Sequence, residues 1–302
     1  AEVVLSLRAS GAIVIGKTHT TEFALFDPSP ACNPHNTDHT PGGSSSGSGA
    51  AVASGTVPMA LGTQTLASVN RPAAYCGISA FKPSTRSMSG FGVAPLAPSF
   101  DTIGFYGWTV DDAVFVYEAA VAHVHTTGPN LDDVINSRII IIDDPLITDC
   151  GADMIKAFDI ETERFRSLGH RIERVASPVS FASLSKLHWN TMVYEASRAL
   201  AHLKEFSEDL IGFRLREVLE EGSAMTTEQY IMDRAKINEL RRIFFAAFDR
   251  SDSYIWPATP GPAPKGLAST GEPKYIDPWT TLGGPLITLR TEKKSKGQPL
   301  GC

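Results

Sequence analysis

The apolar positions of this chain follow two spacings, one typical of helices and one typical of strands. In the predicted helices, apolar residues recur every three to four positions and form one face. These segments cover residues 1–10, 49–54, 110–121, 152–167, 181–204, 207–221 and 226–249. Short apolar runs between turn-forming residues predict strands at 12–15, 58–61, 78–81, 138–143, 170–175, 254–256 and 286–289. Because strands and helices alternate, we expect an α/β fold with a mixed, mostly parallel central sheet and helices on both of its faces.

The organisation of the chain favours one domain. No internal repeat and no long linker divides residues 1–302, so we expect a single α/β domain. Several predicted helices fall within residues 176–250, and we expect this helical middle to form a cap beside the sheet. The first predicted helix shows no N-cap residue, and no closing element follows the last predicted strand. We therefore expect an incomplete domain, truncated at both ends.

Composition and charge narrow the class of protein. Hydrophobic residues make up 42% of the chain and charged residues 20%, the balance of an ordinary globular protein. A net charge of -6 argues against nucleic acid or an anionic membrane as the main partner. No apolar run reaches the ~18–20 residues of a membrane span and no leader is visible, so a cytoplasmic location is expected. The cysteines lack paired spacing, and we interpret them as free thiols without a zinc site.

Small residues are concentrated in one stretch, from Pro41 to Pro83. Its first turn is almost entirely Gly and Ser, and a helix of small residues follows it. A short strand then leads into a second turn rich in hydroxyl groups, which ends at Ser68. Small residues allow backbone to come close to a ligand or to other backbone. The two turns are therefore predicted to face each other across a pocket.

The same stretch resembles the signature of a known family. The matching residues are Gly42-Gly43-Ser44-Ser45-Ser46-Gly47-Ser48, then residues 62–77 (GTQTLASVNRPAAYCG), and then Lys82-Pro83-Ser84. In sequence and spacing they resemble the amidase signature, and weaker similarity in residues 11–24, 100–113 and 257–289 extends the resemblance over most of the chain. The chain looks most similar to malonamidase-like small-amide amidases and to amidotransferase A-subunit-like proteins. The resemblance implies an amidohydrolase that cleaves carbon–nitrogen bonds through a serine acyl-enzyme, without a cofactor or a metal.

The resemblance also implies roles for individual residues. Ser68 matches the nucleophile, and Ser44 matches the cis-serine that relays the proton in a Ser–cis-Ser–Lys triad. The residues matched to the oxyanion hole, through their backbone N–H groups, are Thr65, Leu66, Ala67 and Ser68; those expected to bind substrate are Arg71, Gly43, Ser45 and Gln64. A guanidinium suits a carboxylate, so Arg71 points to a small carboxylated amide, with a structural ion pair as the alternative. We expect a small-molecule partner rather than nucleic acid or membrane, and the resemblance allows a homodimer.

Three departures from the family pattern bear on activity. The family lysine, on a strand upstream of the first predicted strand and in a V-K-D context, has no counterpart in the 302 residues; Lys17 and Lys82 match other positions. Leu66 and Ala67 stand where the family has two glycines, and a side chain there would obstruct a positive φ or a close approach of substrate. Asn70 replaces an apolar residue. An alternative function therefore stays open: a catalytically impaired amidase-fold homologue that acts as a binding or assembly module.

Two glycine motifs of other families are interpreted as coincidental. Residues 11–18 fit the phosphate-loop pattern GxxxxGK[ST], but the four inner residues are strand-like and a helical pattern precedes them. Residues 43–47 fit the nucleophile elbow GxSxG with Ser45 at the centre. An elbow follows a buried strand, whereas turn formers precede this motif.

Histidines in two places are also interpreted as structural. His35 and His39, with Asp38, lack a third metal ligand at a suitable spacing. His123 and His125 are expected at the end of a helix, where the helix dipole favours a cation.

Overall fold

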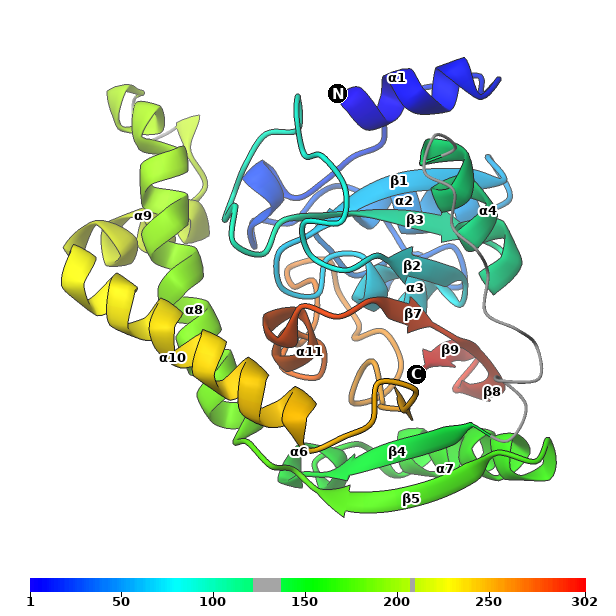
Figure 1. Ribbon diagram of the computed structural model, residues 1–302. Coiled ribbons are helices and arrows are strands. Elements are labelled where there is room, and N and C mark those ends of the chain that lie inside the picture. The colour runs from blue at the N-terminus through cyan, green and yellow to red at the C-terminus, as the bar shows by residue number, and fades with distance from the viewer. Residues whose placement is uncertain (122–136, 207–209) are drawn as a thin grey trace.

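The computed structural model describes residues 1–121, 137–206 and 210–302 (Figure 1). Within these ranges the first sheet has the order β1 (Met59–Gln64), β3 (Thr102–Gly107), β2 (Ser79–Lys82) and β7 (Leu286–Thr288), and all neighbours are antiparallel. The second has the order β5 (Arg171–Ala176), β4 (Arg138–Asp143) and β6 (Ser253–Tyr254), with parallel neighbours. A hairpin of β8 (Arg290–Ser295) and β9 (Gln298–Gly301) completes the strands described.

Helices occupy much of the remaining chain. The longer ones are α1 (Glu2–Ala9), α2 (Ser46–Ala53), α3 (Asn70–Cys76), α4 (Val110–Ala120), α7 (Ala152–Ser167), α8 (Phe181–Ala199), α9 (Phe213–Ala224), α10 (Thr227–Ala246) and α11 (Asp277–Leu282). The short ones are η1 (Glu22–Ala24), α6 (Pro145–Thr148) and η2 (Ala201–Glu205). Local sequence sets several boundaries: Thr109 and Asp112 form a capping box at the start of α4, and Gly77 adopts a left-handed conformation after α3.

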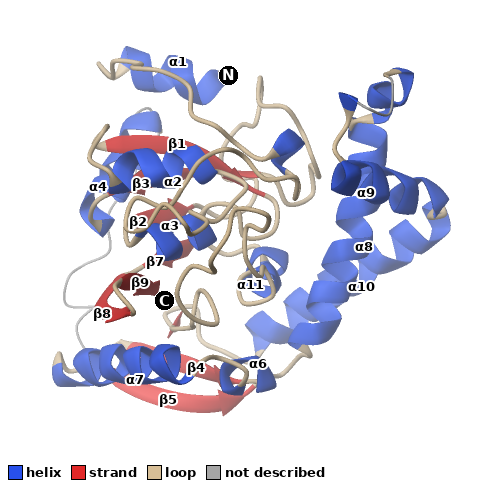
Figure 2. Cartoon of the chain, turned by 180° about the vertical axis from the view of Figure 1, so that it is seen from behind, coloured by secondary structure: helices blue, strands red, loops and turns tan. Residues whose placement is uncertain are grey.

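The four-stranded sheet is covered by helices on both faces. Residues of α2 and α3 pack with Tyr106 of β3 on one face, and Figure 2 shows these two helices in front of the strands. Residues of α1 and α4 pack with Ile103 and Phe105 on the other face. Since successive side chains of a strand point to opposite faces, β3 contributes to both cores. The expected layer of helices on each face is confirmed for this sheet.

The parallel sheet is built around a strand that is buried throughout its apolar run. The four isoleucines 139–142 of β4 are buried, and Phe181, Phe244, Trp256 and Trp279 belong to the same core. A parallel strand covered on both faces has a continuous apolar sequence rather than an alternating one. The bounds predicted for β4 therefore agree with the structure. The bounds predicted for α7, the helix that lies across this sheet in Figure 2, also agree.

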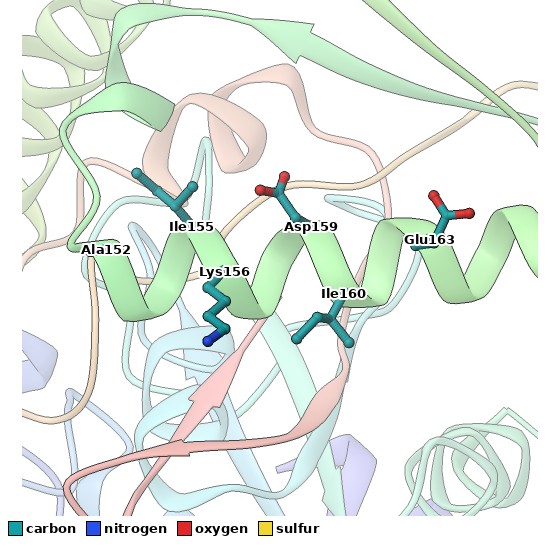
Figure 3. A pocket seen from close by; sticks show the side chains of 6 residues that line it. All are labelled: Ala152, Ile155, Lys156, Asp159, Ile160 and Glu163. Atoms are coloured by element: carbon teal, nitrogen blue, oxygen red, sulfur yellow. The ribbon is translucent and has the colours of Figure 1, made fainter.

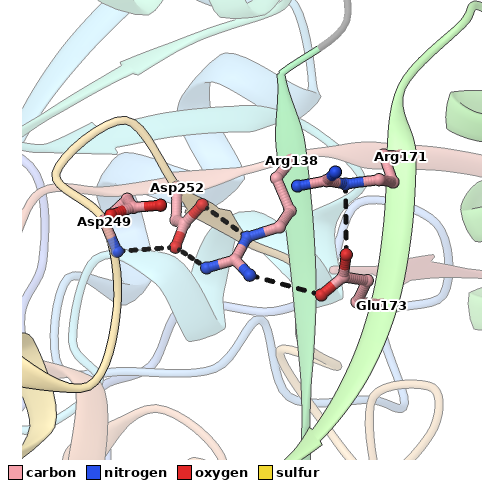
Figure 4. Close-up of polar contacts among 5 residues, drawn as sticks. All are labelled: Arg138, Arg171, Glu173, Asp249 and Asp252. Carbon is pink, nitrogen blue, oxygen red and sulfur yellow. Dashed lines mark hydrogen bonds and ion pairs between the residues drawn. The ribbon is translucent and has the colours of Figure 1, made fainter.

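Charged side chains fix β6 beside β4 (Figure 4). The Nε atom of Arg138 donates to Oδ1 of Asp252 at 2.8 Å, and Nη2 of the same side chain donates to Oδ2. Arg138 also donates to Glu173 at 3.3 Å, and Glu173 pairs with Arg171 at 3.1 Å. The hydrogen bond from Arg138 lowers the pKa of the Asp252 carboxyl. Because Asp252 immediately precedes β6, this guanidinium anchors the edge of the parallel sheet.

The mixed α/β class predicted from the sequence is confirmed, but strand pairing in the described residues is not mostly parallel. Parallel pairs occur between β4 and its two neighbours, whereas β1, β2, β3 and β7 pair antiparallel. Antiparallel neighbours can be joined by a loop, as β2 and β3 are here, whereas parallel neighbours need a crossover such as α7. The helical segment α8–α10 lies beside the sheets (Figure 1), and its role as a cap stays a prediction.

The strand predicted at residues 12–15 is wrong. No described strand pairs with this segment, and the side chains of Ile13, Val14 and Ile15 are 83%, 60% and 75% exposed. A strand needs a partner for its backbone groups, and an apolar run alone does not supply one. The elements β3, β8, β9, α3 and α11 are not predicted from the sequence, because they are short or rich in Gly, Pro and charged residues.

The sequence predicts no membrane span and no disulfide. Among the helices of the described residues, none has both the length and the apolar character needed to cross a membrane. All four cysteines, Cys32, Cys76, Cys150 and Cys302, are free.

We predict that Gly104→Ala destabilises the fold. A Cβ atom at Gly104 would lie 2.5 Å and 2.6 Å from the two γ-carbons of Val69, the residue after Ser68. Overpacking of this kind costs about 1–3 kcal/mol, and chemical denaturation should show that loss in the free energy of unfolding. Gly90→Ala is the matched control, because nothing lies within 4 Å of its Cβ position. Equal stability of the two variants would contradict the prediction.

Candidate active site

The two small-residue turns predicted to face each other are in contact. The backbone N–H of Ser45 donates to the carbonyl of Ser68 at 3.3 Å, which joins the first turn to the end of the second. The Ser45 hydroxyl lies against β1, where it donates to the Thr63 carbonyl at 3.3 Å and accepts from the Thr63 N–H at 3.2 Å. The side chain of Ser45 therefore holds the first turn on the sheet. Both hydrogen bonds are internal, and the predicted role of Ser45 in substrate binding stays a prediction.

Ser44 is held tightly by its backbone and has a free hydroxyl. Its carbonyl accepts hydrogen bonds from the Thr21 N–H at 3.0 Å, the Thr20 hydroxyl at 2.9 Å and the Ser46 N–H at 2.8 Å. The peptide bond between Gly43 and Ser44 is cis, at the position that the resemblance gives to the cis-serine. The Oγ atom of Ser44 is buried and has no hydrogen-bond partner among the described residues.

The structure joins the turn that contains Ser44 to Ser68 through the Ser45 N–H, and it does not join the two serine hydroxyl groups. Since the Ser44 Oγ has no described partner, the two hydroxyls are not hydrogen-bonded to each other. The Ser68 carbonyl accepts from Ser45 and also from the phenol of Tyr106, at 3.2 Å. The backbone of Ser68 is thus fixed from two sides while its hydroxyl is left without a described partner.

The second turn presents a row of unused backbone donors. Among the described residues, none accepts a hydrogen bond from the N–H groups of residues 65–68. The turn is fixed by other atoms: the Thr65 hydroxyl donates to Oδ1 of Asp101 at 2.6 Å, and the Leu66 carbonyl accepts from the Thr280 hydroxyl at 2.6 Å. Buried N–H groups are rarely left unpaired in proteins. This arrangement is suited to stabilising a developing oxyanion.

Leu66 and Ala67 fit the turn without a left-handed backbone. Neither residue is among those with positive φ, so the side chains do not strain the turn. Leu66 is 7% exposed and packs in the core that includes Phe100 of the following loop and Met192 of α8. The two side chains therefore obstruct no positive φ, because the backbone here stays in the region that L-residues prefer.

Gln64 positions the turn rather than facing a substrate. Its Oε1 accepts from the N–H groups of Val69 at 2.8 Å and Asn70 at 3.0 Å, and its Nε2 donates to the Thr280 hydroxyl at 2.9 Å. The side chain is fully buried. These bonds satisfy orphan donors at the start of α3, which is a structural role, and the predicted substrate-binding role stays a prediction.

The side chain of Arg71 is also hydrogen-bonded to groups inside the protein. Its Nε and Nη2 atoms donate to the Gly43 carbonyl at 3.2 Å and 2.7 Å, its Nη1 donates to the Gly271 carbonyl at 2.7 Å, and Nη2 also donates to Thr270 at 3.1 Å. The side chain is 2% exposed, and burial lowers its pKa. The described partners are two backbone carbonyls and a hydroxyl rather than the carboxylate of an ion pair. The predicted contact with a substrate carboxylate stays a prediction.

Gly43 is required for packing around Arg71. A Cβ atom there would lie 2.5 Å from Cγ2 of Thr270 and 3.1 Å from Cγ2 of Thr21. Its carbonyl is the main acceptor of the Arg71 guanidinium. The contacts of Gly43 are thus with protein groups, and its predicted role in substrate binding stays a prediction.

Sequence reasoning missed the residues that support the second turn from outside the motif. Asp101 accepts from Thr65 and, through Oδ2, from the N–H groups of Leu96 at 2.8 Å and Ala97 at 3.0 Å. In the same loop, the Ser99 N–H donates to Glu195 of α8 at 2.8 Å. Asp101 lies in the segment 100–113, which showed weak family similarity. That similarity was the one signal in the sequence that could have indicated Asp101.

The histidine and lysine candidates occupy structural positions. His35 contacts the Cys76 carbonyl at 2.9 Å and His39 the Ala263 carbonyl at 2.7 Å. No group of potential metal ligands occurs in the described part of the chain. His123 and His125 lie outside the described residues. Lys82 is buried and its Nζ donates to the carbonyls of Pro83 at 2.8 Å and Gly284 at 3.0 Å.

Two hollows lie apart from the serine turns. Figure 3 shows a depression on α7 lined by Ala152, Ile155, Lys156, Asp159, Ile160 and Glu163. All of these come from one helix, and their side chains spread apart, so no set of polar groups converges there. A cavity of about 1260 Å³ begins at Asn70 and extends between β7 and α10. Neither hollow is lined by Ser44 or Ser68.

Comparison with known proteins gives the class to which this fold and site belong. The profile of the Amidase family matches residues 1–302. A crystal structure of an amidase superposes with a TM-score of 0.90 at 29% sequence identity, over 100% of this chain and 72% of that one. A peptide amidase from Stenotrophomonas maltophilia shares the fold, with a TM-score of 0.80 at 24% identity, over 100% of this chain and 71% of the other. The chain belongs to the amidase family. The family and the amidase structures support a hydrolase that acts on carbon–nitrogen bonds other than peptide bonds.

Curated relatives agree with this assignment. The chain is 30% identical to the A-type subunit of the glutamyl-tRNA(Gln) amidotransferase from Shouchella clausii, over 100% of this chain and 72% of that protein. It is 31% identical to the corresponding subunit of Francisella tularensis subsp. holarctica, over 70% of this chain and 47% of the relative. The similarity thus covers from slightly under half to nearly three quarters of these relatives.

We predict that Arg71→Lys destabilises the protein. An ammonium group cannot replace a planar fork that reaches two carbonyls and a hydroxyl, so buried acceptors lose their donors. The expected loss is about 2–4 kcal/mol in the free energy of unfolding measured by denaturant titration. Arg8→Lys is the control, since Arg8 is exposed on α1. A fully stable Arg71→Lys protein whose KM alone rises would restore the substrate-binding interpretation.

We predict a pH-dependent stability term from Lys82. Burial, with a smaller contribution from the Arg241 charge, lowers the pKa of Lys82 to about 7. In the unfolded chain the pKa is near ~10.4, so between these values the unfolded state binds more protons and stability rises with pH. From pH 7 to pH 10, wild type should gain stability relative to Lys82→Met by a few kcal/mol, about 1.4 for each unit of pKa difference.

Thermal unfolding at several pH values measures this term. Lys17→Met, at an exposed lysine, is the control and should show no such trend relative to wild type. A difference between wild type and Lys82→Met that stays constant with pH would contradict the prediction.

Proposed function

We propose that the chain hydrolyses the carbon–nitrogen bond of a small amide, with Ser68 as the nucleophile and Ser44 as the proton relay. The support comes from the junction of the two turns, where Ser45 donates to the Ser68 carbonyl and the adjacent Ser44 hydroxyl is buried without a described partner. A serine hydroxyl is a weak nucleophile unless a neighbouring group takes its proton. A buried hydroxyl that the fold leaves unsatisfied beside the nucleophile is a suitable intermediary.

In the proposed reaction, the Ser68 Oγ forms a bond to the amide carbonyl carbon. Its proton passes to the Ser44 Oγ, which gives its own proton to a base. The N–H groups of residues 65–68 stabilise the oxyanion of the tetrahedral intermediate. Collapse breaks the carbon–nitrogen bond, and the departing nitrogen receives a proton returned through Ser44. Water then cleaves the acyl ester, which releases the acid and regenerates Ser68.

The base in this scheme is a neutral primary amine. In the family that the sequence resembles, a lysine provides this amine, and that lysine has no counterpart in the 302 residues. No described residue contacts the Ser44 hydroxyl through a hydrogen bond, and the buried amine of Lys82 is bound to two backbone carbonyls. The same unpartnered hydroxyl favours the second candidate function, an amidase-fold homologue that binds or assembles without turnover.

The substrate class is proposed more broadly than the sequence suggested. The prediction of a carboxylated amide depended on Arg71, whose guanidinium is bound to Gly43, Gly271 and Thr270. Without that support, the proposed substrate is a small amide for which no carboxylate is required. The homodimer and the cytoplasmic location also stay predictions.

A fluorophosphonate probe, which reacts with activated serines, tests the proposed nucleophile. We expect labelling at Ser68 and its loss in Ser68→Ala, and in the presence of ethylamine a rate lower by about 10²–10⁴ in Ser44→Ala. Ethylamine added to the 302-residue chain should raise the labelling rate in wild type, because it can occupy the place of the base, and should have no effect in Ser44→Ala. Peptide mapping by mass spectrometry identifies the modified residue.

Ser54→Ala is the control, because Ser54 is an exposed serine at the end of α2 whose loss should leave labelling unchanged. If Ser68 stays unlabelled both with and without ethylamine in folded protein, the hydrolase proposal is wrong for this chain and the non-catalytic alternative stands.

A further inference from the structure

Glu195 of α8 accepts hydrogen bonds from α10 and from the loop before β3. Its Oε2 atom accepts from the Ser99 N–H at 2.8 Å, and its Oε1 atom accepts from the Ser99 hydroxyl and from the Tyr230 phenol of α10, the latter at 2.7 Å. Burial, together with the bond to Glu195, raises the pKa of Tyr230, so the phenol keeps its proton and donates. All of these partners are donors, and an ionised carboxylate offers them acceptors only. Glu195 therefore links α10 to the loop that contains Ser99.

The loop held by Glu195 is closed on itself by Asp101. Oδ2 of Asp101 accepts from the N–H groups of Leu96 at 2.8 Å and Ala97 at 3.0 Å. The Asp101 N–H donates in turn to the Ala97 carbonyl at 2.9 Å. These bonds make residues 96–101, the Asp101 loop, one compact turn. A displacement at one end of the Asp101 loop is therefore passed to the other end.

The Asp101 loop also holds the second small-residue turn. The Thr65 hydroxyl donates to Oδ1 of Asp101 at 2.6 Å. Phe100 of the loop packs in the same core as Leu66 of the turn. Among the described residues, Glu195 forms no hydrogen bond with the turn itself. Its influence on the turn therefore passes through the Asp101 loop.

A second residue of α8 contacts the same loop by stacking. The rings of His188 and Phe100 have centroids 3.8 Å apart and planes at 15° to each other. His188 and Glu195 lie about two helical turns apart, so they share a face of α8. Stacked rings keep two elements close, whereas a hydrogen bond weakens steeply at poor angles and so defines direction. Glu195 is therefore the contact that orients the Asp101 loop.

Two other charged groups act near Glu195. Burial raises the pKa of Asp101, and the Glu195 charge adds a smaller contribution in the same direction. Arg234 of α10 acts on the Tyr230 phenol, where its charge opposes the larger effect of burial on the pKa. No ion pair within the described residues includes Glu195. A neutral residue in place of Glu195 would relieve a repulsion with Asp101, so a loss of function in such a variant would reflect lost hydrogen bonds.

We propose that Glu195 is a positioning residue for the hydrolysis proposed above, because its carboxylate orients the Asp101 loop and thereby the N–H groups of residues 65–68. The role rests on that proposed function, since these groups need an oxyanion to act on. Gln64 and Thr280 hold other atoms of the turn, so the turn stays folded when Glu195 is changed. Its donors are then displaced from the oxyanion, which weakens stabilisation of the transition state and leaves ground-state binding unchanged.

The rate at which a fluorophosphonate probe labels Ser68 measures this role. Glu195→Gln keeps the size of the side chain but places an amide donor where an acceptor oxygen was. In the 302-residue chain with ethylamine, we expect the maximal labelling rate to fall about 10–100-fold, because a misplacement near 1 Å costs on this order. The probe concentration that gives half of the maximal rate should change less than about twofold, since the bound ground state is unaffected.

Two further variants separate this role from a general loss of structure. Ser99→Ala removes the hydroxyl donor but keeps the Glu195 charge and the N–H bond, and it should lower the maximal rate about three- to tenfold. Glu221→Gln is the matched control. Glu221 is an exposed carboxylate of α9 that accepts from Trp189 of α8 at 2.8 Å, and its variant should label at the wild-type rate.

Hydrogen exchange followed by mass spectrometry reports on the Asp101 loop without reference to activity. In Glu195→Gln we expect residues 96–101 to exchange at least about tenfold faster, because the bond to the Ser99 N–H is weakened. The buried residues 139–142 of β4 should exchange at the wild-type rate, which shows that the fold is intact. If these core residues also exchange faster, the labelling rate of Ser99→Ala decides in place of that of Glu195→Gln.

Four outcomes would overturn the role of Glu195. They are a wild-type labelling rate in the deciding variant, a higher half-maximal probe concentration in place of a lower maximal rate, unchanged exchange of residues 96–101 in Glu195→Gln, and an equal loss of labelling in Glu221→Gln. In each of them wild type is labelled, so the proposed hydrolysis stands. Wild type that stays unlabelled at Ser68 with ethylamine would instead overturn the hydrolysis, and the role of Glu195 with it.

Discussion

A single buried guanidinium holds the two serine turns in register. Arg71 lies in the first turn of α3, immediately after the second turn, and donates to the carbonyl of Gly43 in the first. A buried cation is tolerated when its N–H groups find acceptors, and here carbonyls and a hydroxyl provide them. The position of Ser44 therefore depends on a residue three places after Ser68.

The support of the second turn reaches as far as the helical segment α8–α10. Thr65 binds Asp101, the loop that carries Asp101 binds Glu195 of α8 through Ser99, and Glu195 also accepts from Tyr230 of α10 at 2.7 Å. Each contact is a hydrogen bond to a carboxylate, the stronger kind. A shift of α8 relative to the sheets would therefore be transmitted to the N–H groups of residues 65–68.

The local pattern predicted much of the fold and the location of the site. The buried run of β4 and the amphipathic face of α7 agreed in their bounds, because both depend on side chains close in sequence. The two small-residue turns are in contact, as predicted. The contacts of Gln64 and Arg71 could not be predicted, because they include Thr280 and Gly271, which lie about 200 residues away and show no spacing signal. Residues 12–15 had the composition of a strand, and only the structure shows that no described strand pairs with them.

The exposed segment with Ile13, Val14 and Ile15 has a consequence for the behaviour of the chain in solution. Three adjacent branched apolar side chains lie uncovered in an uncharged run without proline. Segments of this composition assemble between molecules into intermolecular β-structure when nothing shields them. Self-association of this protein at high concentration would therefore begin at residues 12–16, and a charged residue placed there would raise its solubility.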